Sequence, residues 1–169
     1  IFQNNIVGWF QGRMEWGPRA LGNRSILANP CNPDMKKIIN SKIKRRESFR
    51  PFAPSILYEK VSEWFENSID VPYMSIVLKL KKNKLGKIPA VTHIDGTGRL
   101  QTVKASSNYL YYELIKSFEK YSGVPILLNT SFNENEPIVN TPEQAIDCFL
   151  RTKMDLLVIG KYMLKRSNL

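Results

Sequence analysis

The stretch that most constrains the fold of this chain is residues 13–25, which lie between the apolar segments 6–10 and 26–28. It contains three arginines, two glycines and a proline, so we expect two strands joined by a polar, glycine-rich turn. Guanidinium groups beside exposed backbone N–H groups can bind phosphate or carboxylate. The stretch therefore predicts an anion site. The alternative is a surface loop whose arginines pair with the chain's own carboxylates.

The chain carries more positive charge than its own carboxylates can balance. Lys and Arg together number 25 against 15 Asp and Glu, so the formal net charge is +10 at pH 7. Some basic groups therefore lack an internal acidic partner, and we expect anionic ligands. A hydrophobic content of 43% over 169 residues supports one well-packed domain, which we place at residues 1–169.

Cys31 and Cys148 lie far apart, and neither belongs to a CxxC pair or a metal-binding cluster. We interpret both as reduced, structural thiols of a cytoplasmic protein. No apolar run approaches the roughly 18 residues that span a bilayer, and no signal-peptide pattern opens the chain, so we expect no membrane association. The first residue is Ile1 rather than Met, and we expect a domain taken from a longer protein.

Residues 35–43 form the first predicted helix. The apolar residues of this segment fall on one helical face, and Asp34 can cap its first turn. The cations that follow can simply balance the negative end of the helix dipole. They exceed what one helix end requires, however, so we favour ligand binding. The cluster consists of Lys42, Lys44, Arg45 and Arg46, with Arg50 close behind.

Three apolar segments follow the basic cluster. Residues 49–57 predict an extended strand, and their prolines indicate a sheet edge or a strand start, with Arg50 projecting from a stiff backbone. Residues 61–65 predict a short helix whose aromatic side chains lie in the core. Residues 74–80 predict a strand that ends at a lysine run, which we interpret as a solvated loop.

Residues 88–103 predict a hairpin. Two alternating segments flank the sequence Asp-Gly-Thr-Gly at 95–98, which is typical of a tight turn. Arg99 then leaves the turn on a strand. His93 is the single histidine of the chain, and we interpret it as a hydrogen-bonded structural residue rather than a metal ligand. Asp95 can hold Arg99 or a metal bound to phosphate, or it can be an ordinary turn residue.

The C-terminal part of the chain alternates helical and strand patterns. Residues 108–121 predict an amphipathic helix, and the apolar run 126–128 suits a central strand. That run leads into small polar residues at 129–133, as at binding sites where strands of α/β sheets end. A helix with a capping box is expected at 141–152, and a final buried strand at 155–160. The order of elements predicts an α/β fold.

The inventory of reactive groups limits the chemistry. One histidine and two cysteines in apolar surroundings support neither a Ser-His-Asp nor a Cys-His site, and no acidic cluster suggests a metal cage. Arg, Lys, Asn, Ser and backbone amides remain. Such groups suit reactions in which catalysis is mainly positioning and charge stabilisation around phosphates. The sequence therefore predicts a nucleotide or acyl-phosphate site.

Four motifs, at residues 9–26, 49–55, 93–103 and 128–133, occur in an order that resembles the C-terminal domain of the O-carbamoyltransferases of nodulation factors and antibiotics. The resemblance extends from about residue 7 to 164. It implies a twisted mixed β-sheet with flanking helices, similar in fold to the threonylcarbamoyl-adenylate synthases. It also implies that the domain converts carbamoyl phosphate and ATP into carbamoyl adenylate. A separate N-terminal domain, actin/sugar-kinase-like and metal-binding, then transfers the carbamoyl group to a hydroxyl.

The resemblance also implies a set of site residues. Lys44 and Arg50 would hold carbamoyl phosphate in catalytic roles, and Arg19 and Arg99 would neutralise phosphates of the nucleotide. Mg²⁺ would arrive with ATP, bound by phosphates and water, so no metal site is expected within the domain. The predicted site consists of Arg19, Lys44, Arg50, Arg99, Asn129 and Ser131.

By the same resemblance, Asn129 and Ser131 would hydrogen-bond the carbamoyl group and the α-phosphate. One departure from the family is the turn 133–137, where we expect some relatives to carry Gly; Asn tolerates the left-handed region, so only the loop shape is affected. Two other functions compete with the enzyme. A basic nucleic-acid-binding module of the same fold is the less favoured alternative, and a purely structural domain is the third.

Overall fold

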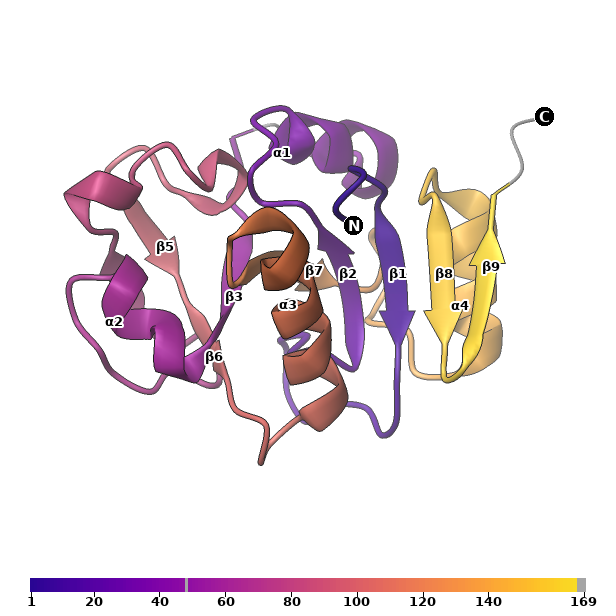
Figure 1. The fold of residues 1–169 in the computed structure, drawn as a ribbon. Helices are drawn as coiled ribbons and strands as arrows, with labels where there is room; N and C mark the ends of the chain where they lie inside the picture. The colour runs from indigo at the N-terminus through magenta and orange to yellow at the C-terminus, as the bar shows by residue number, and fades with distance from the viewer. Residues whose placement is uncertain (48, 167–169) are drawn as a thin grey trace.

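The short apolar runs of the sequence assemble into a seven-stranded sheet with the order β6-β3-β7-β2-β1-β8-β9 (Figure 1). The computed structural model describes residues 1–47 and 49–166. β1 is parallel to β8 and β3 to β6, whereas the other neighbouring strands are antiparallel. This confirms the predicted α/β fold with a mixed sheet. The strands are Val7–Phe10 (β1), Arg24–Ala28 (β2), Ala53–Leu57 (β3), Gln101–Val103 (β6), Ile126–Ser131 (β7), Leu156–Ile159 (β8) and Tyr162–Lys165 (β9).

Two helices cover opposite faces of this sheet (Figure 1). α3 (Tyr109–Ser122) packs on β3 and β7, and α4 (Pro142–Arg151) packs on β1 and β8. Gly123 ends α3 in the left-handed conformation (φ 71°). Thr141 and Gln144 form the capping box of α4. Both helices agree with the sequence prediction.

The predicted helix at 35–43 is divided into α1 (Met35–Ile39) and a π-helix, η1 (Asn40–Lys44). Asp34 makes no side-chain capping bond, so the predicted cap is wrong. Its own backbone is helical (φ −85°, ψ −11°), whereas a capping residue is typically extended. After η1, Arg45 has left-handed backbone angles (φ 44°), and this turns the chain sharply before Arg46.

A separate two-stranded sheet pairs β4 (Val77–Lys79) with β5 (Thr97–Arg99). The predicted hairpin across 88–103 is therefore wrong. The segment before the turn contains a 3₁₀ helix, η4 (Pro89–Val91), instead of a strand. Pro89 disfavours a strand here because it has no N–H to donate to a strand ladder. The strand predicted at 74–80 is shorter than expected, since Met74 has a positive φ of 55° and cannot continue a strand.

For two strand predictions, the structure decides between the expected alternatives or alters the expected position. Of the two alternatives for the prolines of residues 49–57, it supports the strand start. β3 lies between β6 and β7, so it is not an edge strand; Pro54 lies at its start, and pairing with β6 begins only at Ser55. The strand predicted as final and buried, β8, is instead followed by β9, and three of its four residues are partly exposed. The sequence pattern of β8 is that of a strand covered on both faces.

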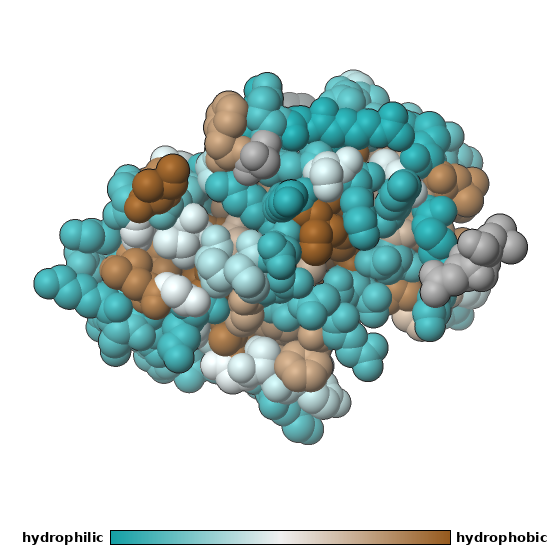
Figure 2. All heavy atoms as spheres, turned by 90° about the horizontal axis from the view of Figure 1, so that it is seen from above, coloured by the Kyte–Doolittle hydropathy of each residue, from teal (hydrophilic) through white to brown (hydrophobic). Residues whose placement is uncertain are grey.

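The remaining elements are short helices: η2 (Tyr58–Lys60), α2 (Val61–Trp64) and η3 (Lys82–Lys84). Trp64 is buried, as predicted for the core. Within the described residues, no helix is both long and apolar enough to cross a membrane. Seen from above, the face on which α1 lies is mainly hydrophilic, with separate apolar patches (Figure 2). The apolar residues of β2 and β7 form the centre of the core.

Candidate functional site

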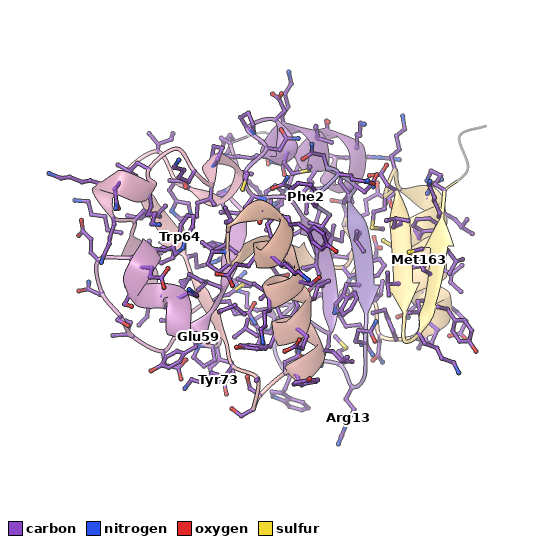
Figure 3. All side chains as sticks on the ribbon, viewed as in Figure 1. Phe2, Arg13, Glu59, Trp64, Tyr73 and Met163 are labelled. Atoms are coloured by element: carbon purple, nitrogen blue, oxygen red, sulfur yellow. The ribbon has the colours of Figure 1, made fainter. Side chains whose placement is uncertain are left out.

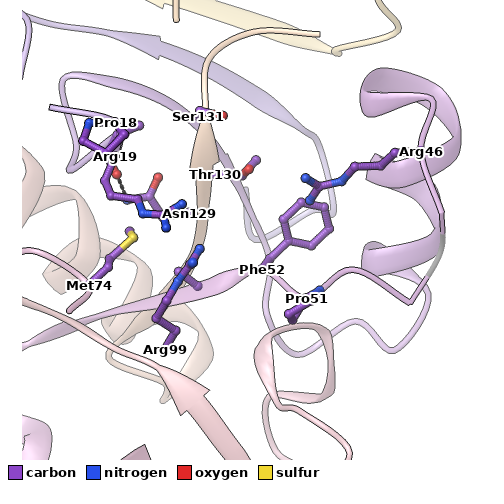
Figure 4. Close-up of a pocket in the computed structure, with 12 residues that line it drawn as sticks. Pro18, Arg19, Arg46, Pro51, Phe52, Met74, Arg99, Asn129, Thr130 and Ser131 are labelled. Carbon is purple, nitrogen blue, oxygen red and sulfur yellow. Dashed lines mark hydrogen bonds between the residues drawn. The ribbon is translucent and has the colours of Figure 1, made fainter. Parts of the chain in front are cut away.

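One cavity brings together side chains from distant parts of the chain (Figure 4). Its volume is about 100 Å³, and it adjoins the end of β7 and the start of β3. Four of the six predicted site residues line it: Arg19, Arg99, Asn129 and Ser131. The complete lining is Pro18, Arg19, Ala20, Arg46, Pro51, Phe52, Ala53, Met74, Arg99, Asn129, Thr130 and Ser131.

Arg19, Arg46 and Arg99 make this cavity strongly positive. Its described lining contains no acidic residue, and no ion pair within residues 1–47 and 49–166 involves these three arginines. Burial lowers the pKa of Arg99, and the charge of Arg19 lowers it further. Burial is the main cause that lowers the pKa of Arg46, followed by the charge of Arg50; Glu47 opposes the shift, and the charge of Arg99 adds the smallest lowering effect. A bound anion would relieve this repulsion.

Arg46 belongs to the basic cluster of the sequence but was not predicted as a site residue. Its Nε donates to Asn40 Oδ1 at 2.8 Å, and its Cζ lies 4.9 Å from the centroid of the Phe52 ring. Figure 4 shows it approaching the cavity from the side opposite Arg19. The left-handed residue Arg45 determines this direction, and no sequence pattern reveals such a turn at a non-glycine residue.

Asn129 is held in one orientation by its amide nitrogen. Nδ2 lies 3.1 Å from Ala20 O, 3.1 Å from Ser55 Oγ and 2.9 Å from Gln101 Oε1. All three neighbours are oxygens, which fixes the assignment of the amide nitrogen. The other amide atom, Oδ1, is buried and has no hydrogen-bond partner within the described part of the chain. Asn129 therefore carries a buried acceptor without a partner among the described residues, and Oδ1 is closed to solvent in this structure.

Lys44 lies beside the cavity, and it is absent from the described lining. The side chain is buried, and Nζ donates to Ser131 O at 2.7 Å, Asn133 O at 2.7 Å and Asn133 Oδ1 at 2.6 Å. Burial lowers the pKa of Lys44 to about 7, and the charge of Arg46 acts in the same direction. Lys44 thus anchors the end of β7, where Ser131 lines the cavity.

Arg50 is also outside the described lining of the cavity. Its Nε lies 3.0 Å from a carboxylate oxygen of Glu47, and both side chains are more than half exposed. Its charge nevertheless reaches Arg46 strongly enough to lower the pKa of that guanidinium. The structure therefore places Arg50 on the surface near Arg46, outside the described lining of the cavity.

The stretch 13–25 folds around one carboxylate. Glu15 Oε1 accepts the backbone N–H groups of Leu21 at 2.8 Å and Asn23 at 2.6 Å. Gly22 has φ +112°, and a Cβ there would lie 2.2 Å from the Tyr111 ring. Tyr111 therefore requires glycine at this point of the loop.

Only one of the three arginines in this stretch lines the cavity. Arg24 is buried and structural, since its Nη1 donates to Gln11 O at 2.8 Å and its Cζ lies 3.5 Å from the Phe10 ring centroid. Arg13 extends away from the molecule (Figure 3). Of the three, Arg19 is the arginine that lines the cavity.

Other candidate groups form local hydrogen bonds, and none of them belongs to the described lining of the cavity. His93 Nδ1 lies 3.0 Å from Thr97 Oγ1, so the predicted hydrogen-bonded histidine is confirmed. Asp95 accepts from the Thr97 hydroxyl at 2.7 Å, as a turn residue does. Both cysteines are free. Within the described residues, no three or more His, Cys, Asp or Glu side chains are grouped so that they could hold a metal ion.

Sequence patterns did not indicate Phe52 or Met74 as cavity residues, whereas Thr130 belongs to the polar stretch 129–133 that the sequence associated with a binding site. Phe52 supports Arg46, and Met74 enters the cavity wall from a segment with left-handed backbone. Thr130 lies between two predicted site residues on β7.

Comparison with known proteins gives a consistent result. Residues 1–166 match the family described as "Carbamoyltransferase C-terminus". The nodulation protein NolNO of Sinorhizobium fredii is 51% identical over 99% of this chain and 25% of its own length. The nodulation protein NolO of Bradyrhizobium diazoefficiens is 49% identical over 95% of this chain and 30% of its own length. The chain thus spans about a quarter to a third of these relatives.

Among solved structures, full-length HypF in a phosphate- and nucleotide-bound form has a similar fold. The TM-score is 0.58 at 20% identity, with 93% of this chain and 19% of HypF covered. This likeness concerns the fold alone, whereas the family match and the two nodulation proteins extend over nearly all of the sequence. On that basis the chain belongs to the carbamoyltransferase C-terminus family.

Proposed function

We propose that this chain is the carbamoyl-activating part of a carbamoyltransferase. It binds carbamoyl phosphate and ATP with Mg²⁺, and it forms carbamoyl adenylate. The remainder of a longer polypeptide then transfers the carbamoyl group to a hydroxyl of a small molecule. Family membership supports carbamoyl transfer in general, and the cavity described above supports the particular ligands.

The arginines support the phosphate part of this proposal. Arg19, Arg46 and Arg99 converge from three separate segments on a cavity of about 100 Å³. Each charge-assisted hydrogen bond contributes roughly 1.5–3 kcal/mol, so several of them can hold a phosphorylated ligand. The cavity is smaller than the about 300–1,000 Å³ of pockets that enclose drug-sized ligands. It therefore suits the reacting carbamoyl and phosphate groups, with the nucleoside outside.

The unpartnered oxygen of Asn129 is the observation that carries the choice of a carbamoyl group. Phosphate and carboxylate oxygens accept hydrogen bonds and cannot satisfy Oδ1, which is itself an acceptor. The NH₂ of a carbamoyl group can donate to it, provided that ligand binding opens the cavity toward Oδ1, which is closed to solvent in this structure. A positive cavity with one buried acceptor thus matches a ligand that combines negative oxygens with one amide nitrogen.

The proposed reaction requires the protein to position the reactants, and it does not require a nucleophilic side chain. Hydrolysis of carbamoyl phosphate leaves carbamate and inorganic phosphate. A carbamate oxygen then attacks the α-phosphorus of ATP, the bond to the β-phosphate oxygen breaks, and pyrophosphate leaves. Arginines stabilise the charge that develops on the phosphate oxygens. Lys44 positions Ser131 and the end of β7 through its bonds to the backbone.

The test uses the purified chain with ATP, Mg²⁺ and carbamoyl phosphate. Pyrophosphate and carbamoyl adenylate are the expected products, and chromatography with mass spectrometry detects them. Acetyl phosphate is the matched control, because its methyl group replaces the NH₂ that Asn129 would accept from. An unpaired buried acceptor costs about 1–3 kcal/mol, so acetyl phosphate should bind roughly 5- to 150-fold more weakly. Equal binding of the two ligands would contradict the role of Asn129.

A nucleic-acid-binding module would behave differently. Its affinity for a polyanion should fall steeply with salt, with a slope set by several phosphates, while free ATP should bind poorly. Tight, salt-sensitive binding of an oligonucleotide without pyrophosphate release would favour that alternative. A folded chain that binds neither ATP nor carbamoyl phosphate would favour a structural domain.

A further inference from the structure

Gln101 is a buried residue that does not belong to the described lining of the cavity, yet it contacts a residue that does. It is the first residue of β6. Its Oε1 accepts from Ser55 Oγ at 2.6 Å and from Asn129 Nδ2 at 2.9 Å, and its Nε2 donates to Leu21 O at 2.8 Å. One side chain therefore connects β3, β7 and the loop 13–25.

The donors and acceptors around Gln101 can be arranged in one way only. Leu21 O is a backbone carbonyl and can only accept, so the amide nitrogen of Gln101 faces it and the amide oxygen faces the other two groups. The Ser55 hydroxyl donates its hydrogen to Gln101, so it accepts from Asn129 at 3.1 Å. Asn129 thus meets acceptors, and its Nδ2 rather than its Oδ1 points into this network.

Gln101 fixes the orientation of the Asn129 amide in two ways. It supplies one of the acceptors directly. It also holds the carbonyl of Leu21, and the preceding carbonyl, Ala20 O, is a second acceptor 3.1 Å from Asn129 Nδ2. Ser55 cannot fix the orientation by itself, because a hydroxyl can donate as well as accept. Without Gln101, a flipped Asn129 amide could accept from Ser55.

We propose that Gln101 is a positioning residue that determines the specificity of the cavity. It keeps Oδ1 of Asn129, and not Nδ2, as the amide atom available to a ligand. An acceptor at this point favours a ligand that carries an N–H group, whereas a flipped amide would donate to any acyl or phosphate oxygen. This inference rests on the proposed function, in which the carbamoyl NH₂ reaches Oδ1. Gln101 itself touches no ligand and acts through Asn129.

The preference for carbamoyl phosphate over acetyl phosphate measures this specificity. Calorimetry of the variant Gln101→Met should show the preference reduced at least about fivefold, because a buried hydrogen bond to Asn129 is lost together with the bond that holds the loop. Ser55→Ala is the matched control. It also removes a buried partner of Asn129, but Gln101 Oε1 and Ala20 O remain as acceptors, so the preference should change by less than about twofold.

Nuclear magnetic resonance tests the positioning without a ligand. The NH₂ protons of Asn129 should show nuclear Overhauser contacts to Ala20 in the wild-type chain and in Ser55→Ala. In Gln101→Met these contacts should weaken, and the protons should exchange with water at least about tenfold faster. Unchanged contacts and unchanged exchange in a folded Gln101→Met variant would overturn the inference.

The binding data separate this inference from the proposed function. A wild-type chain that binds both acyl phosphates equally would overturn the proposed function and, with it, the specificity role of Gln101. A wild-type preference that Gln101→Met retains would overturn this inference alone. If Gln101→Met does not fold, Gln101→Glu replaces it, because a carboxylate oxygen still accepts from Asn129. This variant should keep most of the preference, and its complete loss in a folded protein would contradict the role of Oε1.

Discussion

Three consecutive cations, Lys44, Arg45 and Arg46, have three different environments. Lys44 is buried beneath Ser131 and Asn133. Arg45 points outward and its Nε lies 2.9 Å from a Glu134 oxygen. Arg46 reaches the cavity. The π-helix and the left-handed Arg45 send the three side chains in different directions, so only Arg46 lines the cavity, although its charge still lowers the pKa of Lys44.

Replacing Arg46 by Ala should weaken binding of carbamoyl phosphate by roughly 10- to 150-fold, because a charge-assisted hydrogen bond is lost. Arg45→Ala is the control, since Arg45 is exposed and pairs with Glu134 outside the cavity. Exposed ion pairs contribute about 0–1 kcal/mol. Isothermal titration calorimetry of both variants measures the difference, and equal losses would remove Arg46 from the site.

The lowered pKa of Lys44 predicts that the stability of the protein depends on pH. Folding lowers the pKa of Lys44 from 10.5 to about 7, so between these values the unfolded chain binds a proton that the folded chain does not. Stability should therefore rise with pH in this window, by at most about 1.4 kcal/mol per pH unit from this group. Below pH 7 both states are protonated, and the contribution becomes constant.

The variant Lys44→Met isolates this effect from other titrating groups. Urea denaturation of both proteins at pH 7 and pH 9 should give a smaller increase in the free energy of unfolding for the variant. Parallel curves would mean that Lys44 keeps its ordinary pKa when folded.

At the scale of elements, the loop 13–25 is an ordered platform. The Glu15 carboxylate accepts backbone N–H groups of the loop. The side-chain amide of Asn129 donates to Ala20 O at 3.1 Å, and that of Gln101 donates to Leu21 O at 2.8 Å. These bonds connect the loop to β7 and β6. The backbone that carries Arg19 is thus fixed before any ligand binds, which reduces the ordering cost of binding.

Gly22→Ala should destabilise the protein by about 2–4 kcal/mol, because the new Cβ would overlap the buried Tyr111 ring in addition to straining the backbone. Gly17→Ala is the matched control. Gly17 also has a positive φ of +104°, but a Cβ at this position would have no atom within 4 Å. Chemical denaturation should show a cost of only about 1 kcal/mol for the control. Similar costs would mean that Tyr111 does not restrict the loop.

At the scale of the whole molecule, a ligand in the cavity connects segments from residue 18 to residue 131. Binding to the folded state alone stabilises it by mass action. Carbamoyl phosphate at 100 times its Kd should add about 2.7 kcal/mol, or roughly 5–10 °C in Tm for a chain of this size. Differential scanning fluorimetry measures the shift, and potassium chloride at equal ionic strength is the control. An equal shift with chloride would indicate general screening of the net charge of +10.

The sequence alone determined the elements whose signals are local. The capping box at Thr141 and the apolar run of β7 depend on neighbouring residues, so pattern and composition identified them. It also indicated Arg19, Arg99, Asn129 and Ser131, because the family resemblance added long-range information to the motifs. The strand pairing of β8 and the burial of its two faces could not be predicted from the sequence, since both depend on segments far away in the chain.

Tertiary structure decided which charges meet. Arg46, rather than Arg50, lines the cavity because the left-handed turn at Arg45 and the Phe52 ring direct it there. Lys44 became a buried anchor because the end of β7 supplies the oxygens that surround its ammonium group. Local sequence specifies backbone preference and charge, whereas the direction of a side chain follows from packing between distant segments.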